Sequence, residues 1–149
     1  MWRVAKRTSD SPRLGRRGMA TVEFALVALL LMTWIFGMID IARAFWTYQI
    51  MEQVAVSGAR CMGVLASGCS SSGAYSSTAA QAYIVNLASQ MGLSITANNL
   101  ALSRPANCAN TAGFSQVTVN YVFNTASPVL LPALSGINLT STACYYNTQ

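Results

Sequence analysis

The stretch Arg16-Arg17-Gly18-Met19-Ala20-Thr21-Val22-Glu23-Phe24, with the apolar run that follows it to Ile39, decides the architecture of this chain. A basic segment ends at a glycine, and a single glutamate stands five residues later, where the apolar run begins. An unpaired carboxylate at the edge of a lipid-facing helix is energetically costly. Glu23 therefore needs a cationic partner, which a simple membrane anchor would not require.

Cleavage after Gly18 would create such a partner. The α-amine of Met19 would become free and positively charged, and Glu23 of one subunit can neutralise the amine of a neighbouring subunit. A glycine at the cut leaves the backbone uncovered, so that a peptidase can approach an extended chain closely. Together, a basic leader, a glycine, a glutamate at the fifth new position and an apolar helix resemble the type IV prepilin pattern. An ordinary interfacial carboxylate is the alternative interpretation of Glu23.

The net charge of +5 belongs entirely to the segment before the glycine. Six basic residues precede it, against Asp10 alone, and the three arginines and three acidic residues after it cancel. Positive residues beside an apolar span stay in the cytoplasm, so the leader is expected inside and the C-terminal part outside. A nucleic-acid-binding surface would need clustered cations after the helix, and the sequence has none.

One long helix is expected from about Met19 to Met62, because its sequence contains no proline or glycine pair. The run 24–39 is sixteen residues long, and its flanks extend it towards the roughly 20 residues that span a bilayer. The expected transmembrane part is about 22–40, and residues 1–18 are expected to be disordered or only transiently structured. The second half is predicted to be amphipathic. Its expected apolar face comprises Ile41, Phe45, Tyr48, Met51, Ala55, Ala59 and Met62, and Asp40 and Arg43 are expected to pair on its surface.

The remaining residues predict a small α+β head. After a Gly/Ser-rich loop at 63–77, a second helix is expected, with Thr78 and Gln81 as its capping box and Gly92 as its stop. Alternation over 117–123 predicts a strand, with 137–146 as its antiparallel partner. A third strand is expected at either 93–97 or 100–103. The expected domains are thus a removed leader (1–18), a long helix (19–62) and an extracytoplasmic head (63–149).

Four cysteines lie on the expected outer side: Cys61, Cys69, Cys108 and Cys144. An even number in an oxidising compartment indicates two disulfides, for which three connectivities are possible. We favour Cys61–Cys69 and Cys108–Cys144. Free buried thiols are one alternative. A metal site is disfavoured, because the chain has no histidine and no C-x-x-C motif.

No catalytic residues are predicted. The sequence has no histidine, and the three acidic residues after the leader all lie on the first helix. The abundant serines and threonines therefore lack a base partner, and no nucleophile–base pair can be assembled. The chain is expected not to be an enzyme and to need no cofactor or metal.

Within the prepilin group the chain resembles TadE-like minor pilins, or pseudopilins, of the bacterial tight-adherence (Flp) pilus. The resemblance rests on residues 18–27 (GMATVEFALV) and 36–45 (FGMIDIARAF). It implies that Gly18 and Met19 flank the cut of a membrane prepilin peptidase, and that Glu23 with Phe24 serves assembly. The head is larger than that of the short major Flp pilin, which favours a minor component needed for pilus assembly and surface attachment.

The resemblance also implies a location and partners. The expected chain crosses the bacterial inner membrane once, with its N-terminus cytoplasmic and its head periplasmic, before it reaches the pilus at the cell surface. Its expected partners are the prepilin peptidase, other pilins, the inner-membrane assembly platform and membrane lipid, with no nucleic acid. An alternative function starts from Ala42-Arg43-Ala44, which fits a signal-peptidase site. Cleavage after Ala44 would release a secreted binding module, and an uncleaved chain would be a singly anchored one.

Overall fold

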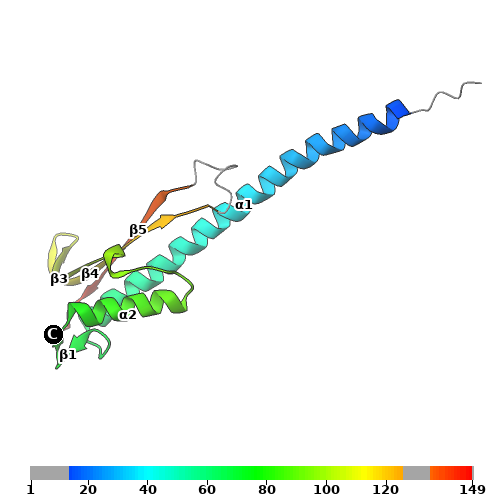
Figure 1. The fold of residues 1–149 in the computed structure, drawn as a ribbon. Helices are drawn as coiled ribbons and strands as arrows, with labels where there is room; N and C mark the ends of the chain where they lie inside the picture. The colour runs from blue at the N-terminus through cyan, green and yellow to red at the C-terminus, as the bar shows by residue number, and fades with distance from the viewer. Residues whose placement is uncertain (1–13, 126–134, 149) are drawn as a thin grey trace, which may run out of the picture. The chain divides into compact units, whose positions relative to one another are not determined.

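The computed structural model describes residues 14–125 and 135–148, with side chains described from Gly18 onward (Figure 1). The chain divides into two compact units, one ending at Gly37 and the other beginning at Met38. The expected α+β layout is confirmed. In chain order the elements are α1 (Leu14–Gly63), β1 (Ser70–Ser71), β2 (Ala74–Tyr75), α2 (Ser77–Gln90), the 3-10 turn η1 (Ala97–Asn99), β3 (Leu100–Cys108), β4 (Thr111–Phe123) and β5 (Ile137–Tyr146).

Helix α1 is continuous over 50 residues and ends close to the expected position. Its sequence is rich in Ala, Leu, Ile and Met and contains no proline, so little opposes helix formation. The helix begins at Leu14, so the expectation of a disordered leader is wrong for residues 14–18. Helix formation propagates readily into such a flank, because each added residue gains one hydrogen bond. Residues 1–13 lie outside the described part of the chain.

The buried face of α1 agrees with the predicted one at Met51, Ala55, Ala59 and Met62, but not in its first part. Ile41, Phe45 and Tyr48, all predicted to face the core, are exposed. At 3.6 residues per turn, eleven residues make just over three full turns, so Asp40 lies on the same stripe as Met51 and Ile41 does not. The residues of α1 that are buried are Asp40, Met51, Val54, Ala55, Gly58, Ala59, Cys61, Met62 and Gly63.

The second helix forms as predicted but begins with a different cap. Ser76 is the N-cap residue of α2, and its hydroxyl accepts a hydrogen bond from the backbone N–H of Ala79 at 3.4 Å. The predicted cap, Thr78, lies inside the helix. The expected stop is confirmed, since Gly92 follows the C-cap with φ +82°, a left-handed conformation that favours glycine.

The main sheet has the strand order β3-β4-β5, with both pairs antiparallel. Strand β5 has the bounds predicted for it, whereas β4 starts six residues earlier than predicted. The third strand is β3, which contains the second of the two predicted stretches, 100–103, and continues to Cys108. A short hairpin of β1 and β2 was not predicted.

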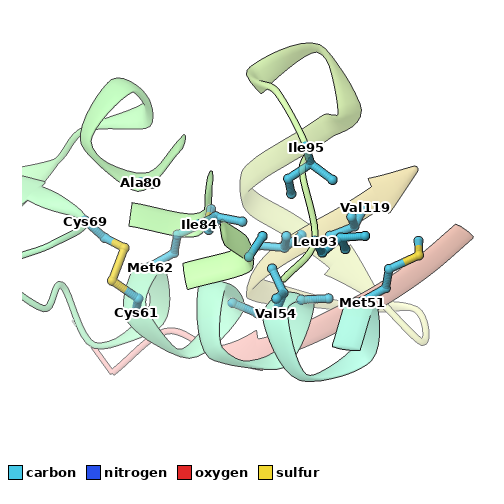
Figure 2. Packing of buried hydrophobic residues seen from close by; sticks show 14 residues of the cluster. Met51, Val54, Cys61, Met62, Cys69, Ala80, Ile84, Leu93, Ile95 and Val119 are labelled. Carbon is cyan, nitrogen blue, oxygen red and sulfur yellow. A yellow bond between two sulfur atoms is a disulfide. The ribbon is translucent and has the colours of Figure 1, made fainter. Parts of the chain in front are cut away.

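The core of the second unit lies where α1, α2 and β4 meet (Figure 2). Met51, Val54 and Met62 of α1 are fully buried there, with Ile84 of α2. A β-carbon at Gly58 would lie 2.8 Å from the side chain of Ile84, so this glycine permits the close approach of α1 and α2. From β4, Val117 and Val119 complete the centre of the core.

Arg104 is the only charged residue after Arg60 in the sequence, and it caps the C-terminal end of α1. Its Nη1 donates a hydrogen bond to the backbone carbonyl of Met62 at 2.7 Å. The last carbonyls of a helix lack intrahelical donors, and a cation there also complements the helix dipole. The guanidinium lies 5.6 Å from the ring centre of Tyr75. Burial raises the pKa of Tyr75, and the charge of Arg104 partly opposes that shift.

Two disulfides stabilise the second unit, in the pairing favoured from the sequence. Cys61–Cys69 joins the end of α1 to the loop before β1, and both cysteines are buried (Figure 2). Cys108–Cys144 joins the end of β3 to β5. The second bridge closes a separation of 36 residues and the first a separation of 8.

Candidate processing and assembly site

The N-terminal half of α1 presents an apolar surface that its own chain leaves exposed. Met19 and Phe24 are each 74% exposed. In the most apolar stretch of 18 residues of this helix, only 6% of the residues are buried. The mean hydropathy of that stretch is 2.2, and the helix is long and apolar enough to cross a membrane. Exposed apolar area of this extent is unfavourable in water, and contact with lipid or other helices would remove that cost.

Gly18 and Met19 lie within α1 rather than in an extended segment. A β-carbon at Gly18 would meet nothing within 4 Å, so packing inside this chain does not require a glycine there. Glycine destabilises a helix interior by about 1 kcal/mol relative to alanine, and Gly15 adds to this weakness. The peptide bond after Gly18 is therefore in a part of the helix that unwinds at low cost.

Glu23 lies five residues after Gly18 on the same helix, and its side chain is exposed. Within the described residues, Glu23 takes part in no hydrogen bond or ion pair. Its neighbours Val22 and Phe24 are both exposed and apolar. The described part of the chain therefore supplies no donor for this carboxylate.

Asp40 is arranged in the opposite way, and the structure corrects the prediction that it lies on the helix surface. Only 2% of the residue is exposed. The hydroxyl of Thr125, two residues beyond the end of β4, donates a hydrogen bond to Oδ2 of Asp40. The Arg43 guanidinium, half exposed, lies 3.4 Å from Oδ1, so the expected pairing with Asp40 is present in the structure.

Thr125 was not predicted from the sequence. It is 85 residues away from Asp40 and belongs to no periodic pattern, because β4 has already ended. A threonine after a strand is ordinarily interpreted as a turn residue. No local signal distinguishes it from the many other threonines of the head.

The site residues fall into two groups, one in each unit. Gly18, Met19, Glu23 and Phe24 share less than two turns of α1 in the first unit. Asp40 and Arg43 are in the second unit, as are the two disulfides. Across the described ranges 14–125 and 135–148, no group of three or more His, Cys, Asp or Glu side chains is placed to hold a metal ion.

Comparison with known proteins gives one family match, which contains all of these helix residues. Residues 18–60 match the family of TadE-like proteins. The match begins at Gly18 and ends in the last turn of α1, so it covers under a third of the chain and leaves the head outside. It confirms the TadE-like resemblance of the helix and thereby indicates a protein associated with a tight-adherence pilus. Neither the curated proteins nor the solved structures contain a match to this chain.

Proposed function

We propose that this chain is a minor pilin or pseudopilin of a tight-adherence pilus, processed by a prepilin peptidase after Gly18. The observation that carries the proposal is the spacing of Gly18 and Glu23, five residues apart, within the TadE-like segment. Among the described residues, nothing packs where a side chain at position 18 would lie, and Glu23 has no hydrogen-bond or ion-pair partner. Cleavage after Gly18, followed by assembly of the subunits, explains why the sequence has a glycine at 18 and a glutamate at 23.

Cleavage converts an amide into a cationic α-amine on Met19, at the cytoplasmic side of the membrane. A carboxylate and an ammonium that each remain alone at the edge of hydrocarbon are costly to desolvate. When Glu23 of one subunit contacts the Met19 α-amine of the next, the two charges neutralise each other. The carboxylate and the amine are then excluded from water at lower cost. Assembly then stabilises both groups, and Phe24 adds apolar contact beside them.

The topology follows from the charge distribution. The leader, residues 1–18, holds the basic excess and stays cytoplasmic. Residues 19–62 form the helix, which crosses the inner membrane at about 22–40, and residues 63–149 form the periplasmic head. Both disulfides then lie in an oxidising compartment. The partners are the prepilin peptidase, the assembly platform and other pilins, and the finished subunit reaches the cell surface.

Release by signal peptidase after Ala44 is the less consistent alternative. That cut would separate Asp40 from the rest of the chain, although Asp40 is buried and accepts a hydrogen bond from Thr125. It would also leave the hydroxyl of Thr125 without this acceptor. Since a buried polar group that loses its partner costs about 1–3 kcal/mol, the released head would be destabilised.

Substitution of the processing glycine tests the proposal. Gly18→Leu, expressed with the cognate prepilin peptidase, is expected to accumulate as the full-length precursor, because the leucine side chain covers the backbone at the cut. Gly15→Leu is the matched control, and it should be processed like the wild type. Intact-mass measurement of the membrane-extracted protein distinguishes the two forms. Unchanged removal of residues 1–18 from Gly18→Leu would contradict the proposed cut.

A further inference from the structure

The end of the head beside Asp40 carries exposed apolar side chains from both α1 and the main sheet. Trp46 of α1 is 71% exposed, and Val122 of β4 and Ile137 of β5 are also exposed. Val122 lies at the end of β4, where that strand pairs with the start of β5. The hydrogen bond from Thr125 to Asp40 holds this end of the sheet against α1.

A groove of about 630 Å³ lies at the same end of the second unit. This volume is within the range of about 300–1,000 Å³ that is usual for small-molecule sites. Ile39, Arg43 and Trp46 line it from α1, and Tyr121 and Asn124 line it from the sheet. Among the described residues that line the groove, Arg43 is the only charged one. The groove therefore combines apolar and aromatic walls with one cation.

Arg43 has donors to spare for an anion in this groove. In the described part of the chain, its side chain makes one hydrogen bond, from Nη1 to Oδ1 of Asp40 at 3.4 Å. A guanidinium has five N–H donors, in a planar fork that matches the oxygens of a phosphate group. The side chain is half exposed, so an anion can reach it without displacing Asp40.

The position of the groove along α1 indicates the source of that anion. If the membrane span ends at about Asp40, a rise of 1.5 Å per residue puts Arg43 about 4.5 Å and Trp46 about 9 Å beyond it. The polar headgroup layer is about 5–8 Å thick on each side of the hydrocarbon. Side chains of a helix lean towards its N-terminus, so both residues reach back towards the span. Tryptophan is enriched at this level of membrane proteins.

We infer that the groove binds a phospholipid of the periplasmic leaflet of the inner membrane. Its phosphate contacts the guanidinium of Arg43, and one acyl chain runs along Ile39 into the hydrocarbon. The rings of Trp46 and Tyr121 lie at headgroup level, where an amphipathic ring contacts both apolar chains and water. The head then rests on the membrane surface. The inference rests on the membrane topology in the proposed function, and it does not depend on cleavage after Gly18.

Depth-dependent quenching of tryptophan fluorescence tests the position of the groove. Trp2→Phe/Trp34→Phe leaves Trp46 as the reporter, and Trp2→Phe/Trp46→Phe leaves Trp34 within the span. Both full-length variants are placed in vesicles of phosphatidylcholine and phosphatidylglycerol. The vesicles carry either a nitroxide on the headgroup or bromine atoms on the acyl chains. Trp46 should be quenched most by the headgroup nitroxide, and Trp34 most by the bromine atoms.

The two reporters separate failure of the inference from failure of the topology. If acyl-chain bromine leaves Trp34 unquenched, the proposed membrane span is wrong and the inference falls with it. If Trp34 is quenched by bromine while Trp46 is quenched by neither probe, the span stands and the inference alone is overturned. The groove would then be left to another occupant, such as a neighbouring pilin.

Substitutions of Arg43 test the contact with the phosphate. Native mass spectrometry of the full chain in detergent micelles, titrated with phosphatidylglycerol, gives the dissociation constant of the bound lipid. Arg43→Gln should raise it at least about tenfold, because charge-assisted hydrogen bonds are the stronger ones. Arg43→Lys keeps the charge and should retain most of the affinity. Arg60→Gln is the matched control, because Arg60 is also exposed on α1 but lies far from the groove. Equal affinities of Arg43→Gln and Arg60→Gln would overturn the inference.

Discussion

The two acidic side chains that flank the apolar part of α1 obtain their partners in different ways. Glu23, in the first unit, is exposed and forms no described contact, whereas Asp40, in the second, is buried against Thr125 and Arg43. Asp40 is satisfied by its own chain. Glu23 has no hydrogen-bond or ion-pair partner among the described residues. The difference separates a residue that stabilises the subunit from one that is available to join subunits.

The same contrast holds for the apolar residues around them. Met51, Val54 and Met62 are fully buried by the head, while Met19 and Phe24 remain three-quarters exposed. One helix therefore carries an internal core surface in its second half and an external contact surface in its first. Substitutions in the first half should alter assembly without altering stability, and substitutions in the second half should do the reverse.

The largest expected effect is the loss of assembly in Glu23→Ala. The variant removes the carboxylate proposed to pair with the new amine, so it should insert in the membrane normally but fail to enter pili. Pili sheared from cells and probed for the subunit provide the measurement. Glu52→Ala is the matched control, because Glu52 is also exposed on α1 but lies outside the expected transmembrane part. Equal incorporation of both variants would contradict the charge-pairing argument.

A large effect on stability, rather than on assembly, is expected from Cys108→Ser/Cys144→Ser. Loss of a bridge that closes a separation of 36 residues should lower the free energy of unfolding by about 4 kcal/mol, through the entropy of the unfolded chain. Thermal unfolding of the full chain in detergent measures this loss. Removal of the Cys61–Cys69 bridge, with a separation of 8, should cost about 2.5 kcal/mol in chain entropy, in addition to any loss of packing. Unchanged stability in the first variant would show that the sheet does not depend on its bridge.

A smaller effect is expected from Asp40→Ala, which leaves the hydroxyl of Thr125 without this acceptor. The expected loss is about 2 kcal/mol of unfolding free energy, measured by denaturant titration. Thr125→Ala removes the donor, and the double variant should lose less than the sum of the two single losses. Strictly additive losses would show that the two side chains do not stabilise the head through their mutual contact. By contrast, Glu23→Ala should leave the unfolding free energy unchanged.

The parts of the fold that local patterns determine could be predicted. The long helix, the strand at 137–146 and the stop at Gly92 follow from apolar periodicity, alternation and the conformational preference of glycine. The TadE-like segment was recognised because its motif is contiguous. In each case the determining residues belong to one continuous element of the chain.

The features that the sequence analysis missed have one long-range cause and two local ones. The burial of Asp40 requires Thr125, which is 85 residues away, and no local pattern encodes that contact. The predicted apolar face of α1 followed exposed residues such as Ile41 and Phe45, since hydrophobicity alone does not distinguish a core face from an external contact face. Ser76 precedes Thr78 by two positions and acts as the cap, and both residue types are favourable caps, so composition did not separate them.

The most direct test of the central claim is the N-terminal sequence and intact mass of the mature protein from its native host. If the chain is cut after Gly18 so that a new amine can meet Glu23, the protein begins at Met19. A protein that begins at Met1 or at Phe45 would contradict this account.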